Sequence, residues 1–270
     1  SLEILQMHTQ GYLVGFKEPP PNEIQVTHTG DFFSCCTEIL SSIMKYIQIH
    51  RNLPSKVNTE DLFSWYKVST SSDITFDFFQ NFNHNSCLSL VETNFQNLNP
   101  ENFEQVVLPI IQKYFTLSDG INKIVTQIEE KYKLNSVFTD KRITICALIY
   151  YRSNVNIKSN YKHLFEKAKI KKDQCNEITF IVQSDVTEFI KDACKILPGC
   201  IVFSDEIECV SQNLKLNVET VYRKNSYKYA KNLLATFYIL SKCDFRIVDA
   251  PNDHKLWLYL YNILRKNTNH

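Results

Sequence analysis

The stretch ITICALIYYRSNVN, from Ile143 to Asn156, decides the fold class of this chain. Its first eight residues form a nearly continuous apolar run of strand length, which is typical of a strand buried on both faces of a parallel sheet. The run ends in a single arginine, Arg152, and continues into small polar residues. Arg152 is therefore either an anion-binding group delivered by a buried strand or the first solvated residue after that strand.

Three further strand-like runs follow, and a helical pattern lies between each run and the next. The runs are NEITFIVQSD (176–185), GCIVFSDE (199–206) and CDFRIVD (243–249). The helical patterns cover about 161–169, 186–197 and 227–241. Strands that alternate with helices predict a parallel, doubly wound α/β sheet. A last helix is expected after Asp253, with an apolar stripe of Leu256, Trp257, Leu260, Tyr261 and Leu264.

The first half of the chain is richer in helical patterns. Ile24, Val26 and His28 alternate with polar residues and predict a strand, which Gly30 follows as a turn. A helix should come next, with Ile39, Ile43, Tyr46 and Ile47 at helical spacing. Further helices are expected to begin at Asn99–Pro100 and at Ser118, and Pro109 is expected to kink or split the first of these.

A polar break near Asn135–Lys141 separates the two halves. We therefore expect two domains, residues 1–138 and residues 139–270, and the length of the chain allows two hydrophobic cores. The abrupt start at Ser1 suggests one domain of a longer protein.

Composition narrows the function classes. The chain has 270 residues, 44% of them hydrophobic, and a net charge of +1 from 30 basic and 29 acidic side chains, so no nucleic acid partner is expected. No apolar stretch reaches the roughly 18 residues of a membrane span. Most of the nine cysteines lie in apolar runs without a CxxC pair, which indicates buried thiols and a cytoplasmic location. Abundant Asn, Lys, Ile and Tyr with only 5 Gly indicate an AT-biased genome, such as that of a protist or a large virus.

Common catalytic and cofactor motifs do not occur. The sequence contains no GxGxxG, GxxxxGK[ST], HExxH or GxSxG pattern. The seven histidines are dispersed without a pair at metal-ligand spacing, so neither a metal nor another cofactor is expected.

Polar residues gather instead at the predicted strand ends, where open parallel sheets bind their ligands. A guanidinium facing hydroxyls and carboxylates suits a nucleotide sugar, because arginine neutralises a diphosphate and carboxylates accept hydrogen bonds from sugar or base. Ser184 and Asp185 could equally cap the next helix, and Ser204 with Asp205 could form a simple turn. The candidates are Arg152, Ser184, Asp185, Ser204, Asp205, Glu206, Asp249, Pro251 and Asn252, with Gly30, Asp31 and Phe32 at the equivalent place in the first half.

Four segments in order resemble the fucosyltransferase superfamily, which includes α1,2-, α1,6- and protein O-fucosyltransferases. They are THTGDFFSCCTEILSSIMKYI, ICALIYYRSNVN, ITFIVQSDVTEFI and SYKYAKNLLATFYILSKCDFRIVDAPNDHKLWLYL, and together they cover roughly residues 24 to 264. The resemblance implies a GT-B fold, in which two Rossmann-like domains face a central cleft. It also implies a metal-independent, inverting transfer of fucose from GDP-fucose to a glycan or protein hydroxyl.

By this resemblance, Arg152 matches the arginine that contacts the donor diphosphate. Tyr150 stands where the family has histidine, and the run that contains Asn154 lacks the family's charged residues. Asp31 and His28 are candidates for the base that activates the acceptor hydroxyl. The first domain would then hold the acceptor, and the second would hold the nucleotide sugar. A domain that binds a partner or glycan without catalysis is the alternative.

Overall fold

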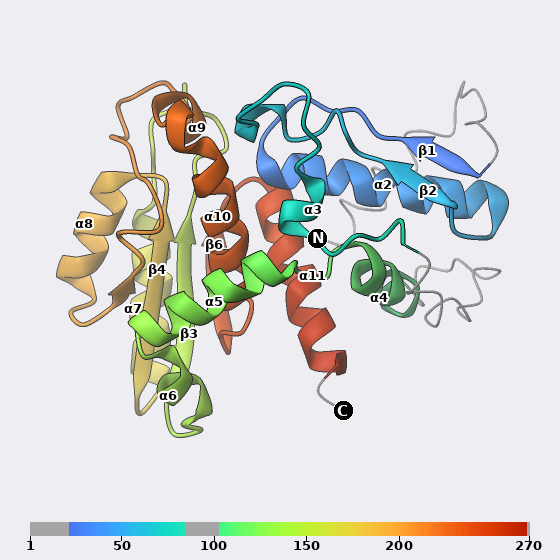
Figure 1. Cartoon of the computed structure of the whole chain (residues 1–270). Helices are drawn as coiled ribbons and strands as arrows, with labels where there is room; N and C mark the ends of the chain where they lie inside the picture. The colour runs from blue at the N-terminus through green and yellow to red at the C-terminus, as the bar shows by residue number, and fades with distance from the viewer. Residues whose placement is uncertain (1–21, 85–102, 269–270) are drawn as a thin grey trace. The chain divides into compact units, whose positions relative to one another are not determined.

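The computed structural model describes residues 22–84 and 103–268 (Figure 1). The described residues form two compact units: the first runs to Ile121 and resumes at Tyr259, and the second spans Asn122–Leu258. We expected the division near residue 138, whereas residues 122–138 belong to the second unit and residues 259–268 to the first. The helix start expected at Asn99–Pro100 lies outside the described residues.

The first unit begins with a strand–helix–strand motif. Strand β1 (Glu23–Gln25) pairs in parallel with β2 (Lys56–Asn58), and helix α2 (Phe32–His50) connects them. Asp31 caps α2 by accepting a hydrogen bond from the Ser34 N–H at 2.8 Å. Thus the predicted order of strand, turn and helix is confirmed, although the strand ends three residues before His28.

An aromatic core holds the rest of this unit together. Phe32 is fully buried among the rings of Phe63, Tyr66 and Phe78, and the Tyr66 hydroxyl accepts the Phe32 N–H at 2.8 Å. The smaller elements of this unit are η1 (Ser64–Tyr66), α3 (Thr75–Phe78) and α4 (Phe103–Tyr114).

Pro109 lies inside α4 and does not split it, contrary to one of the sequence-based expectations. Proline removes one helical hydrogen bond. The apolar residues on either side of it, Val106, Val107, Ile110 and Ile111, are all buried, and this packing keeps the helix continuous. Ser118 starts the next helix as predicted, because its hydroxyl accepts the Ile121 N–H at 3.2 Å.

The second unit is built on a four-stranded sheet whose paired strands all run parallel. Its spatial order is β5-β4-β3-β6, so the first strand along the chain, β3, lies between β4 and β6. The predicted α/β class with a parallel sheet is thereby confirmed. The strands are β3 (Thr144–Tyr150), β4 (Ile178–Ser184), β5 (Ile201–Val202) and β6 (Phe245–Asp249).

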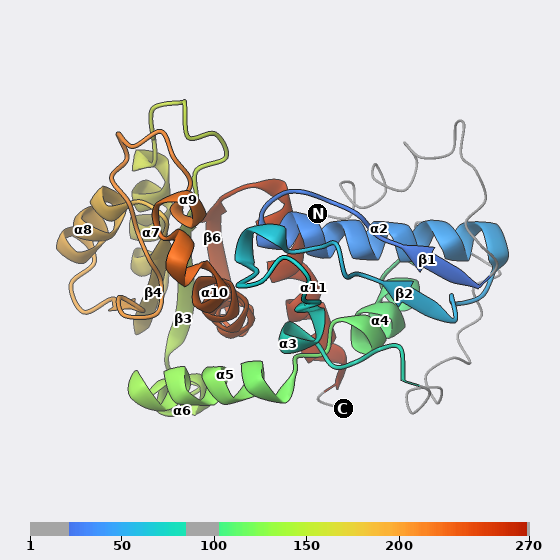
Figure 2. The ribbon, with the colours of Figure 1, turned by 45° about the horizontal axis from the view of Figure 1, so that its top comes forward.

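Helices cover both faces of this sheet (Figures 1 and 2). On one face, Leu148 and Val182 of the strands pack with Phe165 of α7 and Phe189 of α8 in one apolar cluster. On the other face, Gln183 donates a hydrogen bond at 3.0 Å to the Thr236 hydroxyl of α10. The helices of this unit are α5 (Asp119–Lys131, from Asn122 on), α6 (Leu134–Thr139), α7 (Lys162–Gln174), α8 (Thr187–Ile196), α9 (Val218–Val221), η4 (Arg223–Asn225), α10 (Ser226–Leu240) and α11 (Asn252–Thr268, up to Leu258).

Candidate functional site

The order of strands creates a topological switch point between β3 and β6. The chain leaves β3 through α7 on one face of the sheet, whereas it enters β6 from α10 on the other face. In open parallel sheets, ligands bind outside the carboxyl ends of the two strands at such a point. Here those ends carry the connections 151–161 and 250–251, and the helices α7 and α11 begin directly after them.

A histidine and an aspartate meet at this switch point. His163, in the first turn of α7, places Nε2 3.2 Å from Oδ2 of Asp249, the last residue of β6. Their side chains are 45% and 38% exposed, so both remain accessible to a ligand. Asp249 also lies beside Tyr150 in the register of β3 and β6. Burial raises the pKa of Tyr150 above its ordinary value.

Arg152 lies next to this point but turns its guanidinium into the protein. The Nε atom donates to Oδ2 of Asp185 at 2.9 Å, and the Arg152 backbone N–H donates to Oδ1 of the same carboxylate at 3.1 Å. The two terminal nitrogens donate to the carbonyls of Leu214, at 2.6 Å, and Leu216, at 3.1 Å. Only 1% of the arginine side chain is exposed.

These contacts give Arg152 a structural role in the described state. The guanidinium ties the ends of β3 and β4 to the connection that follows β5, and Asp185 supplies the opposite charge. Burial raises the pKa of Asp185, while the nearby Arg152 charge acts in the opposite direction. An anion could reach this guanidinium only after residues 214–216 had moved.

The other candidates from β4 and β5 do not contact the His163–Asp249 pair. Ser184 is fully buried, and its hydroxyl accepts the Val186 N–H at 2.9 Å in a local turn before α8. The helix-cap alternative for Ser184 and Asp185 is wrong, because Val186 occupies the N-cap position of α8 and no side chain caps this helix. Asp205 is exposed and pairs with Lys131 of α5 at 2.8 Å, and Glu206 pairs with the same ammonium at 2.7 Å. This cluster lines a pocket between α5 and α10.

The remaining candidates of the second unit are loop residues. Asn154 is exposed, and its side-chain oxygen accepts the Asn156 N–H at 2.9 Å, so it shapes the connection after β3. Asn252 is exposed at the first position of α11, beside the switch point. Of the predicted second-unit residues, the structure therefore brings Tyr150, Asp249 and Asn252 to one edge.

The candidates of the first unit gather at the start of α2. The His28 Nε2 atom lies 3.0 Å from the Ser34 hydroxyl, and that hydroxyl donates its proton to the Asp31 carbonyl at 2.9 Å. Hence His28 donates to Ser34, and it does not withdraw a proton from it. A Cβ on Gly30 would lie 2.5 Å from the Ser34 oxygen, so any larger residue here would force the Ser34 or His28 side chain to shift. Phe32 exposes no surface to a ligand.

Sequence reasoning missed His163. It lies eleven residues after Arg152 in an ordinary helical pattern, and only the pairing of β3 with β6 brings it to Asp249. A search for helix starts that follow strand ends would have found it, because helix N-termini favour anions.

Neither metal ligation nor membrane spanning is indicated for residues 22–84 and 103–268. No group of three or more His, Cys, Asp or Glu side chains within these ranges could hold a metal ion. None of the helices described there is both long and apolar enough to cross a bilayer. Comparisons with family models, with curated proteins and with solved structures find no match to this chain.

Proposed function

We propose that the second unit binds a nucleoside diphosphate, supplied as a nucleotide sugar, at the switch point between β3 and β6. The observation that carries this proposal is the position of the half-exposed His163–Asp249 pair at the carboxyl ends of these two strands. Ligands of doubly wound sheets bind at this position because two helices approach it from opposite faces and leave a crevice.

Each part of the ligand has a chemically complementary group at this edge. The first backbone N–H groups of α7 and α11 carry partial positive charge and suit a diphosphate. Lys162 and His163 lie exposed in the first turn of α7 and add cationic groups. The Asp249 carboxylate and the Asn252 amide suit the hydroxyl groups of a ribose or of the transferred sugar.

The activity that we propose is glycosyl transfer to a glycan or protein hydroxyl, with GDP-fucose as the first donor to test. The four segments that resemble fucosyltransferases support this donor, and the GT-B arrangement and a cytoplasmic location are part of the same proposal. No metal is needed if helix N-termini and cations stabilise the leaving diphosphate. Asp31 or His28 would serve as the base, and Arg152 would join the donor site only after releasing residues 214–216.

A second candidate is a related domain that binds a nucleotide, glycan or protein without catalysing transfer. The specific observation in its favour is the Arg152–Asp185 ion pair. The guanidinium of this arginine, which matches the family motif, already donates its hydrogen bonds to acceptors of the protein itself. A domain that had lost transfer would retain such an arginine for stability alone.

Calorimetric titration with GDP, UDP and ADP tests the binding proposal. One of these should bind, and at a concentration 100 times its dissociation constant it should stabilise the fold by about 2.7 kcal/mol. Asp249→Asn and His163→Gln should weaken this binding, whereas Asp205→Asn, at the exposed pair with Lys131, should leave it unchanged. If no nucleotide binds, the proposal is wrong. If a nucleotide binds but its sugar conjugate is neither hydrolysed nor transferred, the non-catalytic candidate is correct.

A further inference from the structure

Two cysteines lie close together where α8 ends and β5 begins. Cys194 is in the last turn of α8, and Cys200 directly precedes β5. Their sulfur atoms are 4.0 Å apart, and the Cys200 thiol donates a hydrogen bond to the Cys194 sulfur. Both residues belong to the second unit, and the proposed nucleotide site does not use them. The contact between the two thiols therefore needs its own explanation.

A tight turn brings Cys200 back to the end of the helix. The Cys200 N–H donates to the Leu197 carbonyl at 3.1 Å, which closes a turn over Pro198 and Gly199. Gly199 has a φ of 82°, and proline followed by glycine is the sequence that a type II turn favours. The Leu197 N–H in turn donates to the Ala193 carbonyl at 2.8 Å. The backbone thus anchors the turn on α8 and holds the two thiols near each other.

The two thiols differ in their access to solvent. Cys194 is exposed, whereas Cys200 is half-buried. Burial raises the pKa of the Cys200 thiol, and the neighbouring Cys194 raises it further. Thiol–disulfide exchange begins when an accessible thiolate attacks the reagent. Cys194 is therefore the sulfur that a reagent meets first, and Cys200 is placed to attack the product.

We propose that Cys194 and Cys200 form a site of reversible oxidation, at which a small-molecule disulfide such as oxidised glutathione produces an internal disulfide. The Cys194 thiolate attacks one sulfur of the reagent, so that a mixed disulfide forms and one reagent thiolate leaves. The Cys200 sulfur then loses its proton to solvent and attacks the Cys194 sulfur, which releases the second reagent thiolate. The protein loses two electrons and two protons, and the reagent is reduced to two thiols.

The internal bond needs only a small movement of the chain. Bonded sulfur atoms lie about 2 Å apart, and rotation of the exposed Cys194 side chain can bring its sulfur closer to Cys200. Other cysteines in the described ranges are shielded from a reagent, because burial encloses Cys35, Cys36, Cys146 and Cys243. We therefore expect oxidation to be selective for the pair at the end of α8.

Mass spectrometry of the whole chain after equilibration in glutathione buffers tests the proposal. Once the remaining thiols are blocked, trypsin should release residues 192–195 crosslinked to residues 196–215. Fragment ions should place the bond at Cys200 and not at Cys209, which lies in the same peptide. Dithiothreitol should remove the crosslink, because the bond is a disulfide.

The equilibrium of the exchange shows whether the folded geometry matters. Cysteines this close in the sequence also meet in a flexible chain, so the same measurement in urea is the reference. In the native chain, the equilibrium constant for forming the Cys194–Cys200 bond should be at least about tenfold higher than in urea, because the fold raises the effective concentration of the two thiols.

Variants separate the roles of the two sulfur atoms. Cys194→Ser should abolish the internal disulfide and the uptake of glutathione at this site. Cys200→Ser should instead accumulate a mixed disulfide at Cys194, because the second attack can no longer occur. Cys175→Ser removes another half-buried thiol and should leave the Cys194–Cys200 bond unchanged, so it is the matched control.

Three results would overturn the proposal. The first is a stable mixed disulfide at Cys194 of the wild type without an internal bond. The second is a crosslink that joins Cys194 mainly to Cys209 or Cys175. The third is an equilibrium constant in the native chain that is equal to or below the value in urea, because the fold would then give the pair no advantage.

Discussion

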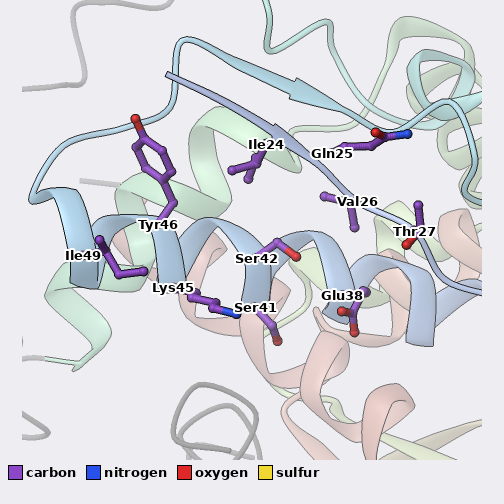
Figure 3. Close-up of a pocket in the computed structure, with 10 residues that line it drawn as sticks. All are labelled: Ile24, Gln25, Val26, Thr27, Glu38, Ser41, Ser42, Lys45, Tyr46 and Ile49. Atoms are coloured by element: carbon purple, nitrogen blue, oxygen red, sulfur yellow. The ribbon is translucent and has the colours of Figure 1, made fainter. Parts of the chain in front are cut away.

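Two buried basic side chains, one in each unit, are held in different ways. Arg152 has an aspartate and two carbonyl oxygens as partners, and its side chain is 1% exposed. Lys45 is 8% exposed beside a pocket on α2 (Figure 3), next to a serine hydroxyl that has no partner in the described residues. The burial of a cation therefore does not by itself identify a ligand site, because the direct partners of the Arg152 guanidinium are acceptors of the protein itself.

The largest expected effect comes from breaking the Arg152 side of this comparison. Asp185→Ala leaves the guanidinium buried without its counter-charge, and it should lower the free energy of unfolding by about 3–5 kcal/mol. Chemical denaturation measures this loss. A double variant, Arg152→Met with Asp185→Leu, should recover most of it, because no unpaired charge remains. A loss below about 1 kcal/mol in the single variant, the value typical of exposed pairs, would contradict the structural role.

The next largest effect concerns the start of α2, where glycine allows close packing. Gly30→Ala would place a methyl group 2.5 Å from the Ser34 oxygen and 2.8 Å from the His28 ring, and it should cost about 1–3 kcal/mol. Thermal or chemical denaturation gives the cost. Ser34→Ala should relieve part of it in the double variant, and equal losses in the single and double variants would show that the crowding lies elsewhere.

A smaller effect, of opposite sign, is expected for Lys45. Lys45→Met removes a desolvated charge and should raise the free energy of unfolding by about 1 kcal/mol at neutral pH. The folded-state pKa of Lys45 lies below its ordinary 10.5. At pH values below this folded-state pKa, the ionised Lys45 therefore lowers the free energy of unfolding of the wild type. The advantage of the variant should therefore shrink as the pH rises through the folded-state pKa toward 10.5. A variant that is less stable than the wild type at neutral pH would contradict this account.

The smallest effect is expected at an exposed lysine that also has carboxylate partners. Lys131 contacts Asp205 at 2.8 Å and Glu206 at 2.7 Å, yet 44% of its side chain faces solvent. Solvent and salt screen such pairs. Lys131→Met should thus leave the denaturation midpoint nearly unchanged, and a shift as large as that of Asp185→Ala would show that partners matter more than burial.

The sequence predicted the sheet of the second unit well because its signals are local. An apolar run such as Ile143–Tyr150 needs burial on both faces, and the segments between such runs have helical periodicity. The split expected as one outcome at Pro109 does not occur for the opposite reason: tertiary packing of the residues around this proline outweighs its local penalty.

The candidate site was only partly predictable. The rule that ligands bind at strand ends pointed to Asp249 and Tyr150, and the structure places these two residues side by side in the register of β3 and β6. The same rule could not distinguish an arginine that faces a crevice from one that faces a carboxylate on the neighbouring strand, because Asp185 is 33 residues away in the sequence. Likewise, the pocket on α2 depends on the position of β1, which no helical pattern reveals.

The most direct test of the central claim is a nucleotide titration of the wild-type chain and of Asp249→Asn, followed by hydrogen exchange at backbone amides. The account predicts that bound nucleotide slows exchange in the connections 151–161 and 250–251 and at the first turns of α7 and α11. It also predicts that Asp249→Asn weakens this protection. A site at the switch point would be contradicted if bound nucleotide slowed exchange elsewhere but not in these segments. It would also be contradicted if Asp249→Asn showed the same protection as the wild type.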